Sequence, residues 1–235
     1  MPRPARPAGH EVLAAVLQIR DGVLQVLVWQ RAQAPDPGRW ALPGGWLGDH
    51  EDVEASVLRQ LAEKVDLREV AHVEQLAVFS APDRVPGVRL LATAFLGLVP
   101  VDTDPAVPAD TAWQPVAALP PTAFDHAEIV AAASDRLRAK LSYTNLGFAL
   151  APREFTISAL RDLYVAALGH PVAATNLQRV LTRRAVLEPT GRVAPPGPAG
   201  GRPAALFRFV DRALRVTDAF AVLRPPSEHL RGAVP

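Results

Sequence analysis

The chain has 235 residues, 49% of them hydrophobic, and a formal net charge of +1. This composition excludes a disordered chain and provides enough apolar side chains for one large domain or two modest ones. The absence of cysteine excludes disulfides and thiolate metal sites, and the longest apolar stretch, Leu90 to Val99, is too short to span a bilayer.

The charge is distributed unevenly along the chain. Residues 153–235 contain 12 Arg and 6 acidic residues, a net charge of +6, whereas residues 1–152 contain 13 basic and 18 acidic residues, a net charge of −5. This asymmetry favours a polyanion as the partner of the basic part, although a chance excess in an Arg-rich chain is the alternative. The basic, Pro-containing start, Met1 to Ala15, makes a poor signal peptide, so we expect a cytoplasmic protein.

The first 141 residues show the pattern of a layered α/β domain. Two apolar runs flank Asp21-Gly22 and predict a β-hairpin. A Gly- and Pro-rich loop over residues 32–49 leads to a helix. The predicted elements, in chain order, are strands Glu11 to Ile19 and Leu24 to Gln30, a helix with Val53, Val57 and Leu61 on one face, strands His72 to Ser80 and Val88 to Val99, an irregular segment Asp102 to Pro121, and a helix Ile129 to Leu141.

The last third of the chain predicts a winged helix-turn-helix. Thr156 is placed to cap a helix over Ile157 to Leu168, and Gly169 to end it. A second helix from about Ala173 to Arg184 precedes two strand-like runs, Val186 to Pro189 and Ala204 to Val210, whose connection is rich in Gly, Pro and Arg. We therefore expect a flexible tail over residues 1–9, a ligand-binding domain with its linker helix over 10–141, the winged helix over 142–225, and a second tail over 226–235.

A long spaced motif runs from Gly45 to Leu67. Gly45, Glu51 and Arg59 follow a Gly-x5-Glu-x7-Arg spacing, and Trp-Ala-Leu-Pro-Gly-Gly leads into it. Both features resemble the Nudix box, whereas an ordinary amphipathic helix after a Gly-rich loop does not explain the Trp-Ala-Leu-Pro-Gly-Gly run. The resemblance implies a Nudix α/β/α sandwich with a mixed sheet.

The chemistry depends on where the motif departs from the family. Active Nudix enzymes present carboxylates at i, i+3 and i+4 of this helix, and these hold Mg²⁺ against a pyrophosphate. Gln60, Glu63 and Lys64 occupy those positions here, and Asp66 replaces the usual Gly. A neutral amide is a weaker ligand and an ammonium repels a cation, so the sequence predicts no catalytic residue and no metal. Lys64 either stands in for the metal against a pyrophosphate or points into solvent.

Over roughly residues 11 to 210 the chain is similar to the Nudix-related transcriptional regulators, the NrtR family. The resemblance is carried by Phe79 to Arg89, by Leu119 to Ile129 with its Phe-Asp-His, by Asn176-Leu177-Gln178-Arg179, and by Gly201 to Arg208. It implies a homodimeric repressor of NAD-biosynthesis or pentose genes, a palindromic operator in double-stranded DNA, and ADP-ribose as the small-molecule nucleotide effector, with no required cofactor.

The resemblance also suggests the site residues. Arg31 is a candidate for bidentate phosphate binding, with Arg89 as a second candidate and Arg84 as a weaker one, and the two glycines permit close backbone approach. His126 either contacts the ligand or caps a helix. The ligand set is Arg31, Gly44, Gly45, Glu63, Lys64, Arg89 and His126. Trp40 and Trp113 are expected to pack in the protein rather than to stack on adenine.

The second helix of a helix-turn-helix reads base edges with its N-terminal residues. Asn176 and Gln178 suit adenine and Arg179 suits guanine, Arg183 and Arg184 suit phosphates, and Arg202 suits the backbone or a minor groove. Two other functions stay open: an active hydrolase of ADP-ribose-like nucleoside diphosphate sugars, and a winged helix that binds protein.

Overall fold

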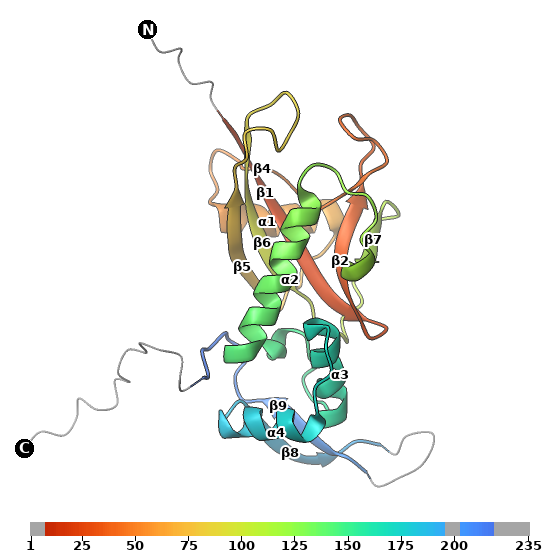
Figure 1. Cartoon of the computed structure of the whole chain (residues 1–235), viewed down its shortest axis with the longest axis vertical. Helices are drawn as coiled ribbons and strands as arrows, with labels where there is room; N and C mark the ends of the chain where they lie inside the picture. Colours follow the sequence, from red (N-terminus) through yellow and green to blue (C-terminus); the bar gives the residue numbers. More distant parts are fainter. Residues whose placement is uncertain (1–7, 196–202, 219–235) are drawn as a thin grey trace, which may run out of the picture.

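The computed structural model describes residues 8–195 and 203–218 and shows two regions, a β-sheet with helices on its faces and a smaller winged helix (Figure 1). A long helix, α2 (His126–Tyr143), runs from the sheet down to the smaller region (Figure 1). Within the described ranges, no helix combines the length and the apolar character needed to cross a membrane.

The described strands of the larger region form one seven-stranded sheet. Its order is β3-β2-β1-β6-β5, with β4 paired to β1 and β7 paired to β2. Only β1 and β6 run parallel, so the sheet is mixed, as predicted. The strands are β1 (Gly9–Arg20), β2 (Val23–Gln30), β3 (Trp40–Ala41), β4 (Gly44–Trp46), β5 (His72–Phe79), β6 (Leu90–Leu98) and β7 (Thr111–Pro115).

The predicted hairpin joins β1 to β2. Asp21 and Gly22 both have positive φ, 51° and 74°, as a two-residue type I′ turn requires. The strands pair on either side of this turn, with Arg20 opposite Val23. The turn residues therefore set the register of the two strands that carry much of the core.

Alternate side chains of β1 point to opposite faces of the sheet and build two cores. Val12 and Val16 face α1 (Val53–Val65), whereas Leu13 and Leu17 face α2. All four are 3% exposed or less. Because helices cover both faces, β1 appears in the sequence as a nearly continuous apolar run.

Three short strands lie where the sequence predicts loops. β3 and β4 fall within residues 32–49, and β7 and the short helix η1 (Val116–Ala118) fall within the segment expected to be irregular. β7 pairs with β2 through contacts such as Val26 with Gln114. When two paired strands lie far apart in the sequence, the residues of each strand alone do not indicate the pairing, because strand formation depends on the neighbouring strand.

The smaller region is the predicted winged helix-turn-helix. Helix α3 (Ile157–Leu168) begins at Thr156, whose Oγ1 accepts a hydrogen bond from the Ala159 N–H at 3.1 Å, and ends at the left-handed Gly169. The remaining elements are η2 (Leu146–Ala149), α4 (Ala174–Arg183), β8 (Leu187–Val193) and β9 (Ala205–Phe209). β8 extends beyond its predicted end because the ladder resumes at Val193 opposite Ala205 after an irregularity.

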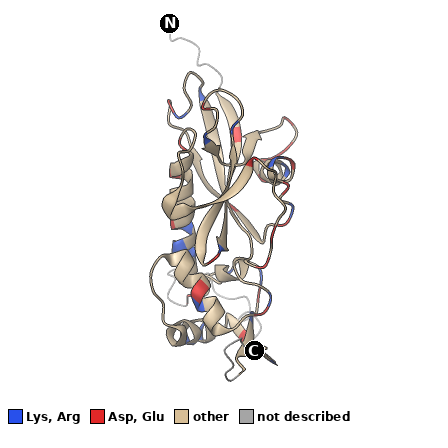
Figure 2. Ribbon diagram, turned by 90° about the vertical axis from the view of Figure 1, so that its right-hand side faces the viewer, with Lys and Arg blue, Asp and Glu red and all other residues tan. Residues whose placement is uncertain are grey.

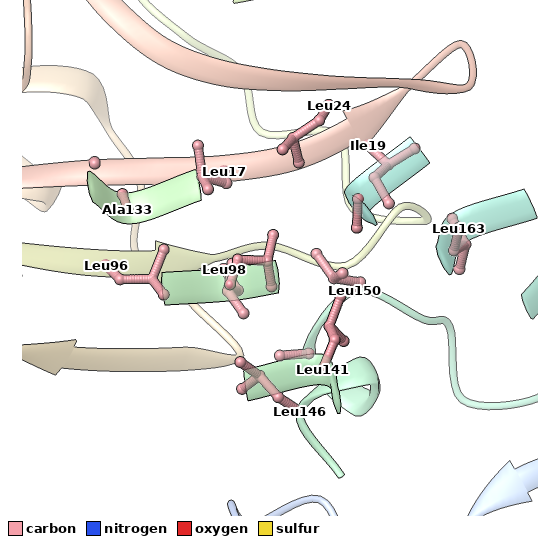
Figure 3. Close-up of a cluster of buried hydrophobic side chains, with 14 of the residues drawn as sticks. Leu17, Ile19, Leu24, Leu96, Leu98, Ala133, Leu141, Leu146, Leu150 and Leu163 are labelled. Atoms are coloured by element: carbon pink, nitrogen blue, oxygen red, sulfur yellow. The ribbon is translucent and has the colours of Figure 1, made fainter. Parts of the chain in front are cut away.

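The two regions share one hydrophobic core. Its buried side chains come from β1, β2 and β6, from α2, from the turn after η2 and from α3; those labelled in Figure 3 include Leu17, Ile19, Leu24, Leu98, Leu141, Leu150 and Leu163. The same cluster continues to α4 and β9. Helix α2 and the winged helix are therefore packed within one continuous interior.

Candidate functional site

A cavity of about 480 Å³ opens between β1, β2, the β3–β4 connection, the end of α1 and the residues before α2. It brings together five predicted ligand residues, Arg31, Gly44, Gly45, Lys64 and His126. They meet because β1 pairs with both β2 and β4. A larger, mostly apolar cavity of about 660 Å³ between α2, α3 and the β1–β2 turn contains none of them.

Arg31 and Lys64 give this cavity its positive charge. Arg31 follows β2, its Nε donates to the Pro35 carbonyl at 3.0 Å, and its guanidinium carbon lies 4.9 Å from the centre of the Phe124 ring. Lys64 lies in the last turn of α1 and is exposed. Within the described ranges neither forms a salt bridge, so both charges are available to an anionic ligand.

Glu11 is a cavity residue that sequence reasoning missed. It lies on β1, and its Oε1 accepts a hydrogen bond from Arg84 Nη1 at 2.6 Å. Burial raises the pKa of Glu11, while Arg84 opposes that shift. An apolar strand gives no sign that one of its side chains lines a cavity, since that depends on which strands pair beside it.

Arg84, the weaker ligand candidate, is a structural residue. Its side chain is 1% exposed, and it donates to Glu11 and, through two bonds of 2.8 and 2.7 Å, to Asp125. It therefore joins β1, the loop before β6 and the start of α2. A guanidinium that already holds two carboxylates is not free to bind a phosphate.

His126 lies in the first turn of α2 and is 3% exposed. Its Nδ1 accepts a hydrogen bond from the Leu42 N–H at 2.9 Å. Burial lowers the pKa of His126 to about 4, against the opposing charge of Asp125. The side chain does not cap α2: it reaches back to the β3–β4 connection and lines the cavity.

The two glycines are required by the fold itself. A Cβ on Gly44 would lie 2.2 Å from the Val12 carbonyl oxygen, and one on Gly45 would lie 2.7 Å from the Gln60 amide. Residues without a side chain allow β4 to lie against β1 and α1. Close packing within the protein therefore explains both glycines.

The positions that carry the metal ligands in active Nudix enzymes do not fit a divalent cation. Gln60 is buried, and its Nε2 donates to the Trp46 carbonyl at 3.3 Å. Glu63 accepts from Arg59 at 3.0 Å, and Lys64 brings an ammonium. Arg59 also binds Glu51, whose pKa it lowers to about 2. Among the described residues no group of three His, Asp or Glu side chains is arranged to hold a metal.

Two predicted ligand residues lie outside the cavity. Arg89 donates to the carbonyls of Ser80 and Ala81 at 2.8 and 3.2 Å and so closes its own loop. Glu63 is turned toward Arg59 on the exposed side of α1. Each side chain bonds to a local partner and does not line the cavity, and its contact with the ligand stays a prediction.

Aromatic residues of the cavity were also missed. Trp29, Trp46 and Phe124 line it, and Trp46 is 61% exposed. Trp46 directly follows Gly45 in the motif, but nothing in the sequence indicates its exposure. Trp40 and Trp113 pack against the two cores, as expected.

The second candidate site is the exposed face of α4. Leu177 and Leu181 are buried against the core. The opposite side presents polar side chains at helical spacing: Thr175, Asn176, Arg179, Thr182 and Arg183. Arg179 Nη2 donates to Asn176 Oδ1 at 2.7 Å, and Gln178 is half-buried beside them. The two threonines were not among the predicted DNA contacts.

Arg184 is not part of this face. It follows the end of α4, donates to the Ser142 carbonyl at 2.8 Å and pairs with Asp218 at 3.2 Å. The helix ends one residue earlier than predicted, and the Arg184 side chain turns toward the end of α2, so its DNA contact stays a prediction. Arg202, the predicted wing contact, lies outside the described residues.

Most other arginines of the winged helix are paired with carboxylates. Figure 2 shows acidic residues interspersed with basic ones over both regions. The pairs are Arg161–Asp162, Arg192–Glu154, Arg208–Glu188 and Arg215–Asp211. Arg179 and Arg183 have no carboxylate partner within the part of the chain that the structure describes. Within the described residues, α4 therefore presents two arginines whose charge is not neutralised by a carboxylate.

Comparisons with known proteins match both regions. Residues 9–133 match the NUDIX domain, and residues 147–209 match the NrtR DNA-binding winged helix domain. The chain is 31% identical over 202 residues to the ADPR responsive transcriptional repressor NtrR of Acinetobacter baylyi, covering 83% of this chain and 79% of that protein.

Solved structures of a second relative cover both regions. Shewanella oneidensis NrtR complexed with a 27mer DNA superposes with a TM-score of 0.72 at 29% identity, over 85% of this chain and 92% of the other. The NUDIX domain of the same protein complexed with ADP ribose superposes with a TM-score of 0.51 at 28% identity, over 58% of this chain and 93% of the other.

Proposed function

The chain belongs to the NrtR family of Nudix-related regulators, and on that premise we propose that it is a homodimeric transcriptional repressor that binds operator DNA through α4 and releases it when ADP-ribose enters the cavity. The observation that carries this proposal is the path of α2. One end of this helix lines a cavity with two cations that form no salt bridge within the described ranges, and the other is buried in the core of the winged helix.

Asn145, two residues after the end of α2, connects this helix to the winged helix. This side chain is 3% exposed; its Nδ2 donates to the carbonyls of Asp211 and Ala213, and its Oδ1 accepts from the Arg215 N–H at 2.7 Å. A dimer on a palindromic operator must place its two recognition helices about 34–36 Å apart, or a multiple of that distance. A ligand that moves α2 changes this spacing and so changes DNA affinity.

The same cavity is proposed to bind a pyrophosphate without hydrolysing it. Arg31 and Lys64 attract the phosphates, and Lys64 occupies a position where a metal ligand is needed for catalysis. Without a metal ion no water is activated for attack on phosphorus. Purified protein with Mg²⁺ or Mn²⁺ should therefore release AMP from ADP-ribose far more slowly than about 1 s⁻¹, a typical enzymatic rate. An ADP-ribose hydrolase with three helix carboxylates serves as the positive control, and turnover comparable to it would establish the hydrolase instead.

The regulatory proposal is tested by the linkage between the two ligands. ADP-ribose should reduce the shift of DNA from upstream of the protein's own gene in a mobility assay. Because binding linkage is reciprocal, operator DNA must weaken ADP-ribose binding by the same factor, roughly 5- to 150-fold for a typical allosteric coupling. Calorimetric titration of ADP-ribose into free and operator-saturated protein measures that factor. Equal affinities in the two titrations would remove ADP-ribose as the effector.

A further inference from the structure

We propose that the Nε2–H of His126 donates a hydrogen bond to a phosphate oxygen of the nucleotide in the cavity and thereby ties the ligand to the first turn of α2. This inference rests on the proposed function, because it requires a nucleoside diphosphate ligand in the cavity. It goes further by assigning the atom through which the ligand reaches α2.

The protonation state of the ring follows from its one hydrogen bond. A backbone N–H can only donate, so the His126 Nδ1 that faces Leu42 N–H must be the unprotonated acceptor. The neutral imidazole then carries its proton on Nε2. Burial holds the pKa at about 4, so this form persists at neutral pH.

The Nε2 atom has no partner within the described residues. It is one of seven buried side-chain atoms there that lack a hydrogen bond, and only His126 among those residues lines this cavity. A buried donor without a partner costs free energy. A ligand acceptor in the cavity removes that cost. If the histidine had only a structural role, its Nε2–H would stay without a hydrogen bond.

The charges around the ring favour an anionic acceptor. The His126 ring lies edge-on to Phe124, with centroids 5.7 Å apart, and the Arg31 guanidinium covers the same Phe124 ring. Asp125, Glu11 and Arg84 are the other charged groups near His126, and Arg84 is already paired with both acids. A phosphate oxygen beside Arg31 accepts from a neutral N–H and also contacts a cation that has no carboxylate partner among the described residues.

Two substitutions test the roles of the two ring nitrogens of His126 independently. The amide of His126→Asn reaches the Nδ1 position, where its oxygen still accepts from Leu42, but it places no donor at the Nε2 position. The amide of His126→Gln reaches the Nε2 position and supplies an N–H there, but it gives up the Leu42 contact. We expect H126N to be the more stable protein and yet the weaker binder, with an ADP-ribose affinity roughly 10- to 100-fold below the wild type, as loss of a hydrogen bond to a charged group implies.

Calorimetric titration of ADP-ribose into the full chain ranks the variants by affinity, and thermal unfolding ranks them by stability. H126N binding weaker than H126Q supports the proposal, since a merely structural role makes affinity follow stability. Wild-type binding with unchanged affinity in H126N overturns the inference and leaves the proposed function in place. A wild-type protein that does not bind ADP-ribose overturns the proposed function, and the inference with it.

¹⁵N NMR of the histidine side chains supplies a readout that a packing role would not change. The free protein should show His126 as the Nε2–H form between pH 6 and 8, and ADP-ribose should shift the Nε2 resonance more than the Nδ1 resonance. ADP-ribose affinity should also be constant over this pH range, because no imidazolium forms. An Nδ1–H form, or an affinity that rises as the pH falls from 8 to 6, would overturn the assignment.

Discussion

Replacing Arg179 and Arg183 together by Ala should lower operator affinity by about 1–3 kcal/mol, roughly 5- to 150-fold, through the base-reading Arg179, and by a further amount that is the same for all DNA sequences through the phosphate-contacting Arg183. Both side chains lie on the exposed face of α4 and lack a carboxylate partner within the described ranges. ADP-ribose affinity should not change, because the cavity is lined by the other region. Mobility shifts at several salt concentrations measure the loss and the change in salt dependence.

The matched control is the double substitution of Arg161 and Arg208 by Ala. It removes the same formal charge from the same region, but each of these arginines is already paired, with Asp162 and Glu188. We expect a small loss of DNA affinity in this control. A loss as large as that of the α4 variant would mean that net charge, rather than the α4 face, determines binding.

Replacing Arg84 by Met should destabilise the fold by about 3–5 kcal/mol, the usual cost of removing one partner of a buried ion pair. The side chain is 1% exposed and binds both Glu11 and Asp125. Without it, two carboxylates stay close together without a cation, and the start of α2 loses its link to β1. Denaturant unfolding of the full chain measures the loss.

The matched control is Arg89→Met, which alters the same loop at an exposed position. It should change stability by no more than about 0.5–1 kcal/mol, because its bonds go to exposed loop carbonyls.

The pH dependence provides a second check on Arg84→Met. Burial already raises the pKa of Glu11, and removing Arg84, which opposes that shift, raises it further, so the folded variant takes up a proton more readily than the wild type as the pH falls. The loss in the free energy of unfolding, relative to the wild type, should therefore be smaller at pH 5 than at pH 7.5. A loss in the free energy of unfolding that is independent of pH would show that lost packing, rather than lost charge, destabilises the variant.

Several elements were predictable from the sequence because their determinants are local. Asp21-Gly22 supplies the two positive φ values of the hairpin turn, and Thr156 and Gly169 supply the caps of α3. The Nudix loop and helix follow from residue spacing, and the exposed face of α4 follows from the positions of Leu177 and Leu181. Backbone conformation and helix periodicity depend on residues a few positions apart, so a single sequence contains them.

The roles of individual polar side chains were decided only by the tertiary structure. Arg31 and Arg84 are the same residue type, yet one faces a cavity without a salt bridge in the described ranges and the other is buried between two acids. His126 acquires its tautomer from Leu42, 84 positions earlier in the chain. Arg184 turns away from α4 because its partners are Ser142 and Asp218. Charge and hydrogen bonding act through space at a few ångströms, so the sequence determines which groups exist, and the fold decides which of them meet.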